Sequence, residues 1–169
     1  MNFAFETAYT PASMTVMAKA LRKTIRAKHS KRSHRFGFLV LLLGLILMLS
    51  AEAVTFRLVL TAAAMAAILL ALIFEDRING YFAYKRILPG MLSSSVQFYE
   101  DGYHSETAVG TSDFRYDSIV MLAEHKDYFI FIFSASHAQL YDKHTLTGGS
   151  CEAFKSFLCE KTGKGFTAI

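Results

Sequence analysis

The common sequence motifs of catalytic sites are absent from this sequence. It contains no G-x-S-x-G, no G-x-G-x-x-G and no Walker phosphate loop. Its six histidines form neither an H-x-x-x-H nor an H-E-x-x-H pair. A metal site would need the fold to bring together three distant side chains, of which His104, His137 and His144 are the candidates. We therefore expect no catalytic residue, no metal, no cofactor and no enzymatic activity.

Cysteine is also scarce. The two cysteines, Cys151 and Cys159, fall on one predicted helix and lie about 12 Å apart along it at 1.5 Å per residue. A disulfide needs Cα atoms within about 7 Å of each other. The sequence therefore predicts two free thiols, which is typical of a reducing compartment.

Acidic residues are nearly absent from the first 35 positions, where Glu6 is the single one. By contrast, residues 75–169 hold nine Lys and Arg against twelve Asp and Glu, so the basic character of the chain belongs to one short segment. We predict that the basic side chains of this segment face lipid, and they are Lys19, Arg22, Lys23, Arg26, Lys28, Lys31, Arg32 and Arg35.

Long apolar runs are plentiful: the chain is 53% hydrophobic, with a mean hydropathy of +0.30. Phe36 to Ala51 carries no charge, and Val54 to Phe74 carries one, Arg57. A helix needs about 20 apolar residues to span a bilayer. Two such runs in succession predict two membrane spans rather than a buried soluble helix or a cleaved signal peptide.

The short connector Ser50–Thr55 predicts a tight helical hairpin in the cell membrane, with both ends on one side. Lys and Arg beside a span stay cytoplasmic, so both termini are expected in the cytoplasm. Small residues allow helices to approach closely. Gly44, Ala63 and Ala67 are therefore candidate helix-packing positions, either within the hairpin or between two copies of the chain.

The segment before the spans predicts a short strand, Phe3 to Tyr9, followed by a helix that Thr10 caps and Pro11 begins. The helix carries an apolar stripe beside its basic residues. It either lies on an anionic leaflet or supplies charge for topology alone. We expect no nucleic-acid partner, because no aromatic residues interleave with the basic ones.

After Pro89-Gly90 the pattern changes to short alternating segments, and Asp101-Gly102 predicts a β-hairpin. The apolar stretch Tyr128 to Phe133 is too short to span a bilayer, so it is predicted to be a strand. Phe129, Phe131 and Phe133 share one face, and both faces are apolar. That face is a candidate partner or domain-packing face. The C-terminal helix, the N-terminal arm, a partner or the membrane surface has to cover whichever face the core does not.

A final helix is predicted from Ser150 to Thr162-Gly163. The expected fold is a membrane α-helical hairpin plus an α+β cytoplasmic domain: a small antiparallel β-sheet or open barrel, PH-like, closed by one C-terminal helix. The expected division is an N-terminal strand and basic amphipathic helix (1–35), the transmembrane hairpin (36–75), a helical extension and linker (76–90), the PH-like domain (91–163) and a tail (164–169).

Four stretches, VQFYEDGY (96–103), FRYDSIVMLAEHKDYFIFIF (114–133), LYDKHTLTGG (140–149) and FKSFLCEK (154–161), resemble the YcxB-like family of bacterial membrane proteins. The resemblance extends from about residue 9 to 161 and departs from the family pattern at 141–143. It implies two spans and a small cytoplasmic C-terminal domain, with Tyr116 and Lys143 among the motif residues. It implies no catalytic residue.

Two functions are compatible with these features. The first is a non-enzymatic, membrane-tethered binding or scaffold module that contacts anionic membrane lipids and a protein partner or a second copy of itself. The alternative is an accessory or regulatory subunit of a membrane complex of transporter or immunity type. An enzyme is a third hypothesis, for which the sequence offers no clustered site.

Overall fold

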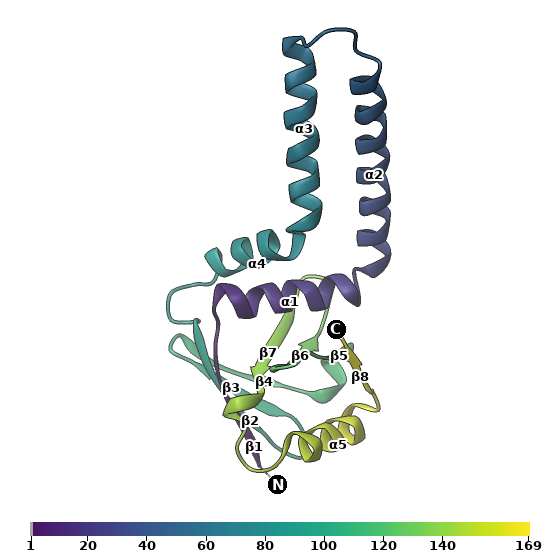
Figure 1. The fold of residues 1–169 in the computed structure, drawn as a ribbon. Helices are drawn as coiled ribbons and strands as arrows, with labels where there is room; N and C mark the ends of the chain where they lie inside the picture. Colours follow the sequence, from purple (N-terminus) through teal and green to yellow (C-terminus); the bar gives the residue numbers. More distant parts are fainter. Residues whose placement is uncertain (1) are drawn as a thin grey trace.

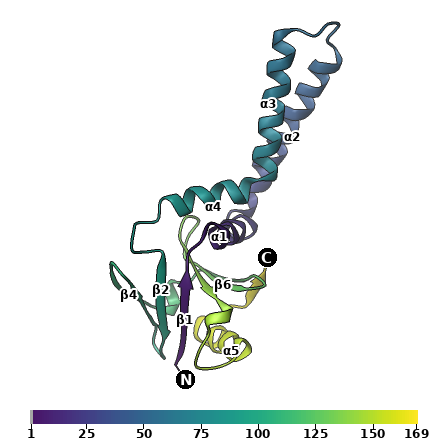
Figure 2. The same cartoon turned by 60° about the vertical axis from the view of Figure 1, so that its left-hand side comes forward.

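A computed structural model describes residues 2–169. Two long helices, α2 (Ala27–Leu49) and α3 (Phe56–Ile73), project as a hairpin from a domain of two β-sheets (Figure 1). Two further helices, α1 (Pro11–Lys23) and α4 (Glu75–Lys85), lie between the hairpin and the sheets (Figures 1 and 2). The molecule therefore has three layers: hairpin, helix pair and β domain.

Both hairpin helices are long and apolar enough to cross a membrane, with mean hydropathies of 1.6 for α2 and 2.4 for α3, and neither apolar window is buried by protein. The helices pack where glycines of α2 face large side chains of α3. A Cβ on Gly44 would lie 2.6 Å from Met65 Sδ, and one on Gly37 would lie 2.9 Å from Leu72 Cδ1. Gly44 thus packs within the hairpin, whereas Ala63 and Ala67 are exposed on its outside.

The first sheet combines strands from both sides of the hairpin. Its order is β1 (Phe3–Ala8), β2 (Ser93–Phe98), β3 (Tyr103–Thr107) and β4 (Gly110–Phe114), all antiparallel. In β1 and β2, Phe3 lies opposite Phe98 and Ala8 opposite Ser93. The hairpin is therefore an insertion within the β domain, and the strand that the sequence assigned to a separate N-terminal arm is an edge strand of this domain.

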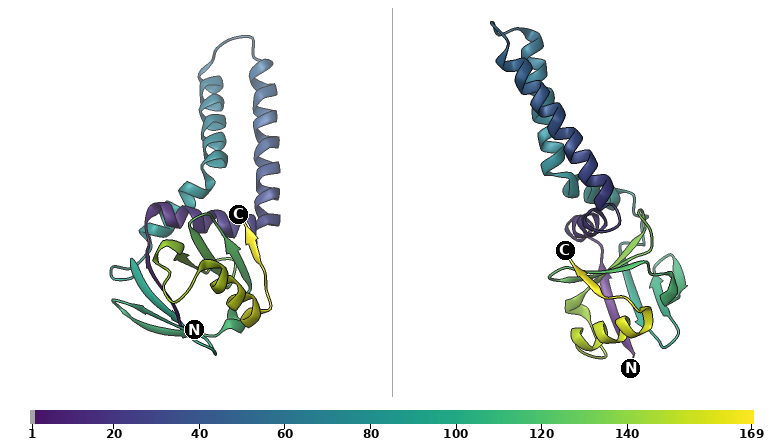
Figure 3. Two further views of the ribbon diagram at one scale, coloured as in Figure 1. Left: turned by 60° about the horizontal axis from the view of Figure 1, so that its bottom comes forward. Right: turned by 90° about the vertical axis from the view of Figure 1, so that its right-hand side faces the viewer.

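The second sheet has the order β7 (Ala138–Asp142), β6 (Tyr128–Ile132), β5 (Met121–Glu124) and β8 (Phe166–Ala168). The apolar stretch at 128–133 thus forms a strand, as predicted. β8 pairs in parallel with β5, so the segment expected to be a tail contributes a strand to the sheet. The helix α5 (Cys151–Thr162) crosses the end of the domain farthest from the hairpin (Figures 1 and 3).

Both faces of β6 are covered by this chain. Phe129 and Phe131 are fully buried in the core between the two sheets and α5. Ile130 and Ile132 are fully buried on the other face, in a cluster that includes Leu21 of α1. Phe133 is partly buried at the edge of the first cluster. The face formed by the three phenylalanines is therefore a domain-packing face, and the N-terminal helix covers the opposite one.

The core between the sheets is built mainly from aromatic rings. Phe5 of β1 packs against Phe154 of α5 with ring centroids 4.8 Å apart, and against Phe98 and Phe129 at 5.9 and 6.2 Å. Each such edge-to-face contact adds about 0.5–1.5 kcal/mol of stability beyond the contribution from burying the apolar surface of the rings. The N-terminal strand thus supplies rings to the centre of the domain, and its loss would open that centre to water.

The loop before α5 closes over β1. The Ala4 amide donates to the Thr147 carbonyl at 3.1 Å, and the Thr147 amide donates to the Ala4 carbonyl at 2.9 Å. Gly148, with a φ of +85°, follows at once, and a Cβ there would lie 2.0 Å from the Asn2 carbonyl oxygen. Only glycine combines this backbone conformation with so close an approach.

Candidate functional site

The layer between the hairpin and the β domain consists of α1 and α4, which lie side by side across the base of the hairpin (Figures 1 and 2). Thr10 caps α1 through a capping box with Ser13, and Pro11 occupies its first turn. The chain turns at Phe74, between α3 and α4, so that α4 leaves the direction of the hairpin. Gly80 of α4 faces the backbone of Thr15, where a Cβ would lie 2.6 Å from the Thr15 nitrogen.

Four charged or titratable side chains join three helices at this layer. Arg22 of α1 donates two hydrogen bonds to Asp76 of α4, at 2.6 and 2.7 Å. Glu75 lies 2.7 Å from His34 of α2 and 3.9 Å from Arg22. The hydrogen bonds to Asp76 raise the pKa of Arg22 above its usual value. The pairing ties the ends of the two hairpin helices to α1. The acidic pair Glu75-Asp76, directly after the second apolar run, is the feature of the sequence that could have indicated it.

The basic residues predicted to face lipid divide into two groups. Lys19, Arg22 and Arg26 are partly buried beside other parts of the protein, and Arg26 Nε donates to the Ala135 carbonyl. The apolar stripe of α1 packs on the β domain rather than outward, since Leu21 is only 6% exposed. The second group is exposed at the end of α1 and along the first turns of α2, and it comprises Lys23, Lys28, Lys31, Arg32 and Arg35.

An exposed apolar surface lies on α4, which the sequence analysis did not identify. Ile78, Tyr81 and Phe82 are 40%, 47% and 55% exposed, and the Lys85 ammonium lies 5.6 Å from the centre of the Tyr81 ring. Tyrosine, lysine and apolar side chains gather where a membrane meets water. The helix α4, which carries this surface, and the start of α2 lie at the same level of the molecule (Figure 1).

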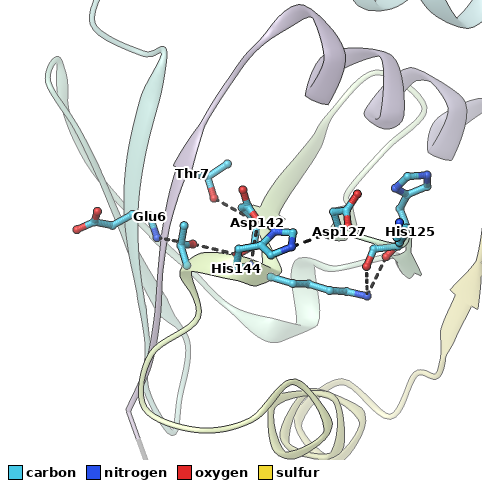
Figure 4. A network of polar contacts seen from close by, with 9 residues as sticks. Glu6, Thr7, His125, Asp127, Asp142 and His144 are labelled. Carbon is cyan, nitrogen blue, oxygen red and sulfur yellow. Dashed lines mark hydrogen bonds and ion pairs between the residues drawn. The ribbon is translucent and has the colours of Figure 1, made fainter.

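A polar network ties β1 to the end of β7 on the β domain (Figure 4). The Asp142 amide donates to Thr7 Oγ1 at 3.3 Å, and the Glu6 amide donates to Thr145 Oγ1 at 3.2 Å. His144 is held by Asp142 at 2.8 Å and lies 4.0 Å from Asp127. These contacts provide hydrogen-bond partners for polar groups at the strand ends and in the short helix η2 (Lys143–Thr145). The network therefore stabilises the junction with the N-terminal strand.

The two motif residues of the family resemblance also have structural roles. Tyr116 is buried, and its hydroxyl lies 2.7 Å from the Tyr99 carbonyl and 3.1 Å from that of Gly102, so it fastens the β2–β3 turn. Lys143 Nζ donates to Glu124 at 2.7 Å and to the His125 carbonyl at 2.8 Å. Burial would raise the pKa of Glu124, but its hydrogen bonds from two lysines lower it overall.

The histidines considered as a metal site lie apart in separate interactions. His104 pairs with Asp113 at 2.7 Å, His144 pairs with Asp142, and His137 stands in the β6–β7 turn. Over residues 2–169 no group of three or more His, Cys, Asp or Glu is arranged to hold a metal ion. His125 is a separate case, because burial and the nearby Lys19 charge lower its pKa. Cys151 and Cys159 are free thiols, as predicted.

The structure defines an α+β domain interrupted by a hairpin of two helices that are long and apolar enough to cross a membrane. Residues 98–158 match the family described as YcxB-like protein, which confirms the predicted resemblance over that part of the chain. The matched region runs from the end of β2 into α5 and omits β1 and the hairpin. No curated protein and no solved structure matches the chain.

Proposed function

We propose that this protein is a non-enzymatic binding or scaffold module held at the cytoplasmic face of the cell membrane by its hairpin. The observation that carries the proposal is the α1–α4 layer. Both ends of the hairpin continue into helices that pack on each other, and α1 also packs on the second sheet. Such an arrangement holds the β domain at a fixed distance from the membrane surface.

The dimensions and exposure of the hairpin support insertion in a membrane. The 18 residues of α3 extend about 27 Å at 1.5 Å per residue, close to the hydrocarbon thickness of about 30 Å. Leu47, Leu49 and Phe56 near the connector are 66–79% exposed, which is costly in water. The lipid bilayer would bury this surface.

The placement of charge supports a cytoplasmic β domain. The exposed Lys28, Lys31, Arg32 and Arg35 lie at the same end of the hairpin as the domain, whereas Arg57 is the single basic residue at the connector end. Lys and Arg near spans favour the cytoplasmic side. They also attract anionic lipid, by about 1 kcal/mol per residue near the surface.

The shape of the domain is compatible with a PH-like binding module. Two four-stranded sheets enclose one aromatic core, and α5 packs on that core. In this interpretation the N-terminal β1 and the C-terminal β8 complete the two sheets. A fold alone does not specify a ligand, so the proposal stops at the class of binding module.

An accessory subunit of a membrane complex is the second candidate function. Ala63 and Ala67 are exposed on the outside of the hairpin, four residues apart on α3. Small residues at this spacing allow another transmembrane helix to approach closely. Under this alternative the hairpin, rather than the β domain, makes the contact with the partner.

One experiment tests the first proposal and separates it from the second. Native mass spectrometry of the full chain, extracted gently from its own membrane, is expected to show a stoichiometric protein partner or a defined homo-oligomer. The double variant Ala63→Leu/Ala67→Leu is expected to keep that association if the β domain makes it, and to lose it if the hairpin does. The variant Leu69→Ile, at another exposed position of α3, is the control. A wild-type monomer without any protein partner would refute the accessory subunit and the scaffold role, and a monomer that retains a lipid or small molecule would reduce the first proposal to a ligand-binding module.

A further inference from the structure

Two adjoining cavities lie beneath α4, at the end of the β domain that faces the hairpin. The first, of about 530 Å³, opens between the sheets, α1 and the linker that follows α4. The second, of about 640 Å³, lies along α1, α4 and the β6–β7 turn. Both fall within the range of about 300–1,000 Å³ that is typical of ligand sites. They adjoin because they share lining residues, namely Met14, Met17, Arg86, Ile87, His137 and Ala138.

The first cavity exists because the inward side chains of the first sheet become small at one end. Along β2, Phe98 and Val96 fill the core, and Ser94 follows on the same face. Along β3, Tyr103 is likewise followed by Ser105. Serine leaves space that an aromatic ring would fill. The sheets therefore enclose an open cavity that is lined by hydroxyl groups.

One of these hydroxyl groups is incompletely satisfied. Ser94 is 7% exposed, and its Oγ makes no hydrogen bond of normal geometry within the described residues; a neighbouring polar group is the Tyr9 hydroxyl, whose pKa burial raises and Ser94 partly lowers. Burying a hydroxyl without a hydrogen bond costs about 1–3 kcal/mol. An oxygen atom of a bound molecule would remove that cost.

The charged side chains that line these two cavities are arginines, whereas Glu6, Glu106 and Asp142 line a neighbouring hollow that shares Ser94 with the first cavity. Arg86 and His137 line both cavities, and Arg26 lines the second. No Asp or Glu lines either cavity, and no ion pair among residues 2–169 involves Arg26 or Arg86. Two unneutralised guanidinium groups in a groove attract an anion, and arginine matches the geometry of phosphate oxygens.

The second cavity has an apolar path leading away from these charges. Leu21 of α1 and Phe82 of α4 line it, and Phe82 is 55% exposed on the layer that adjoins the hairpin. Met17 connects this path to the first cavity. Flexible methionine side chains adapt to the irregular shape of an acyl chain.

We propose that the two cavities together bind one anionic phospholipid drawn from the membrane that holds the hairpin. Its phosphate lies at Arg86 and His137 with an oxygen within reach of Ser94, and an acyl chain leaves over Met17 and Phe82 toward the bilayer. The identity of the source as a membrane lipid rests on the proposed membrane placement. The binding chemistry rests on the groove itself, which is assayed below in detergent, without a bilayer.

The test uses the full chain purified in a mild neutral detergent and titrated with phosphatidylglycerol, phosphatidylcholine or inorganic phosphate, with native mass spectrometry as the readout. We expect one phosphatidylglycerol per chain and much weaker retention of phosphatidylcholine. Arg86→Gln is expected to weaken that retention about tenfold or more, because a hydrogen bond to a charged group is lost. His137→Gln is expected to weaken it in the same direction.

Arg77→Gln is the matched control. Arg77 is an exposed arginine of α4, the helix that ends just before Arg86, but it lines neither cavity, so this variant is expected to retain phosphatidylglycerol as the wild type does. Equal retention by Arg86→Gln and Arg77→Gln would overturn the site. Equal retention of phosphatidylcholine, or displacement of the lipid by inorganic phosphate at a similar concentration, would overturn the assignment of an anionic phospholipid. Orientation of the hairpin in a membrane is measured separately and does not affect these outcomes.

Discussion

Residues 90–169 on their own are expected to remain unfolded, whereas a chain in which a flexible linker replaces residues 27–74 is expected to fold. The reason is that β1 belongs to the domain although it precedes the hairpin. Removing β1 exposes one edge of β2 and deletes two core rings, Phe3 and Phe5, which are 0% and 1% exposed. Each Phe-to-Ala truncation in a core costs about 3–5 kcal/mol, which together equals much of the 5–15 kcal/mol that stabilises a typical domain.

The replacement of the hairpin is feasible because its two ends are close. Arg22 at the end of α1 contacts Asp76 at the start of α4. A ten-residue Gly/Ser linker has a mean span of about 17 Å, enough to join the helices. Thermal unfolding followed by circular dichroism compares the linked chain, the same chain with Phe5→Ala, and residues 90–169. Cooperative unfolding of residues 90–169 at the temperature of the linked chain would show that β1 is dispensable.

Gly80→Ala is expected to destabilise the linked chain, although a Gly-to-Ala change inside a helix ordinarily gains about 1 kcal/mol. Here the new Cβ would lie 2.6 Å from both the nitrogen and the Cα of Thr15. Backbone atoms cannot rotate away, so α1 and α4 have to separate. Overpacking of this kind typically costs about 1–3 kcal/mol, which corresponds to a decrease in Tm of several degrees.

Asn79→Ala provides the comparison for that substitution. Asn79 is the neighbouring, exposed residue of α4, and alanine has the higher helix propensity. We expect this variant to be as stable as the unsubstituted linked chain or slightly more stable. If Gly80→Ala raises the Tm as much as Asn79→Ala does, then α1 and α4 do not pack as closely as described.

Local features of the sequence were sufficient to predict most elements. Thr10-Pro11 marked the start of α1, Asp101-Gly102 the β2–β3 hairpin, and Ser150 and Gly163 the ends of α5. Each of these signals depends on the conformation of a few consecutive residues. The two apolar runs predicted the hairpin helices for the same reason, because length and hydropathy are local properties.

Pairings between distant segments could not be predicted in the same way. β1 and β2 are separated by more than 80 residues, and neither strand carries a signal for the other. The Arg22–Asp76 pair likewise depends on the turn of the chain at Phe74. Both faces of β6 were predicted to be covered. The sequence could not indicate that α1 covers one of them, because this depends on how the helix packs on the sheet.

The cavities and their proposed ligand could not be predicted from the sequence at all. Ser94, Ser105 and Arg86 come from β2, β3 and the end of α4, and no spacing relates them. In the sequence both serines are ordinary polar residues, and no local pattern distinguishes them. They line the cavity because they share the inward face of the sheet with Val96 and Tyr103.

Cysteine accessibility in intact cells tests the central claim, a two-span hairpin with a cytoplasmic β domain, most directly. In a chain with Cys151→Ala and Cys159→Ala, Glu52→Cys places one thiol in the connector, and Asp113→Cys places one on β4, where the native side chain is 88% exposed. A membrane-impermeant maleimide is predicted to label the connector in intact cells and β4 only after lysis. Labelling of β4 in intact cells, or protection of both positions until lysis, would contradict the account.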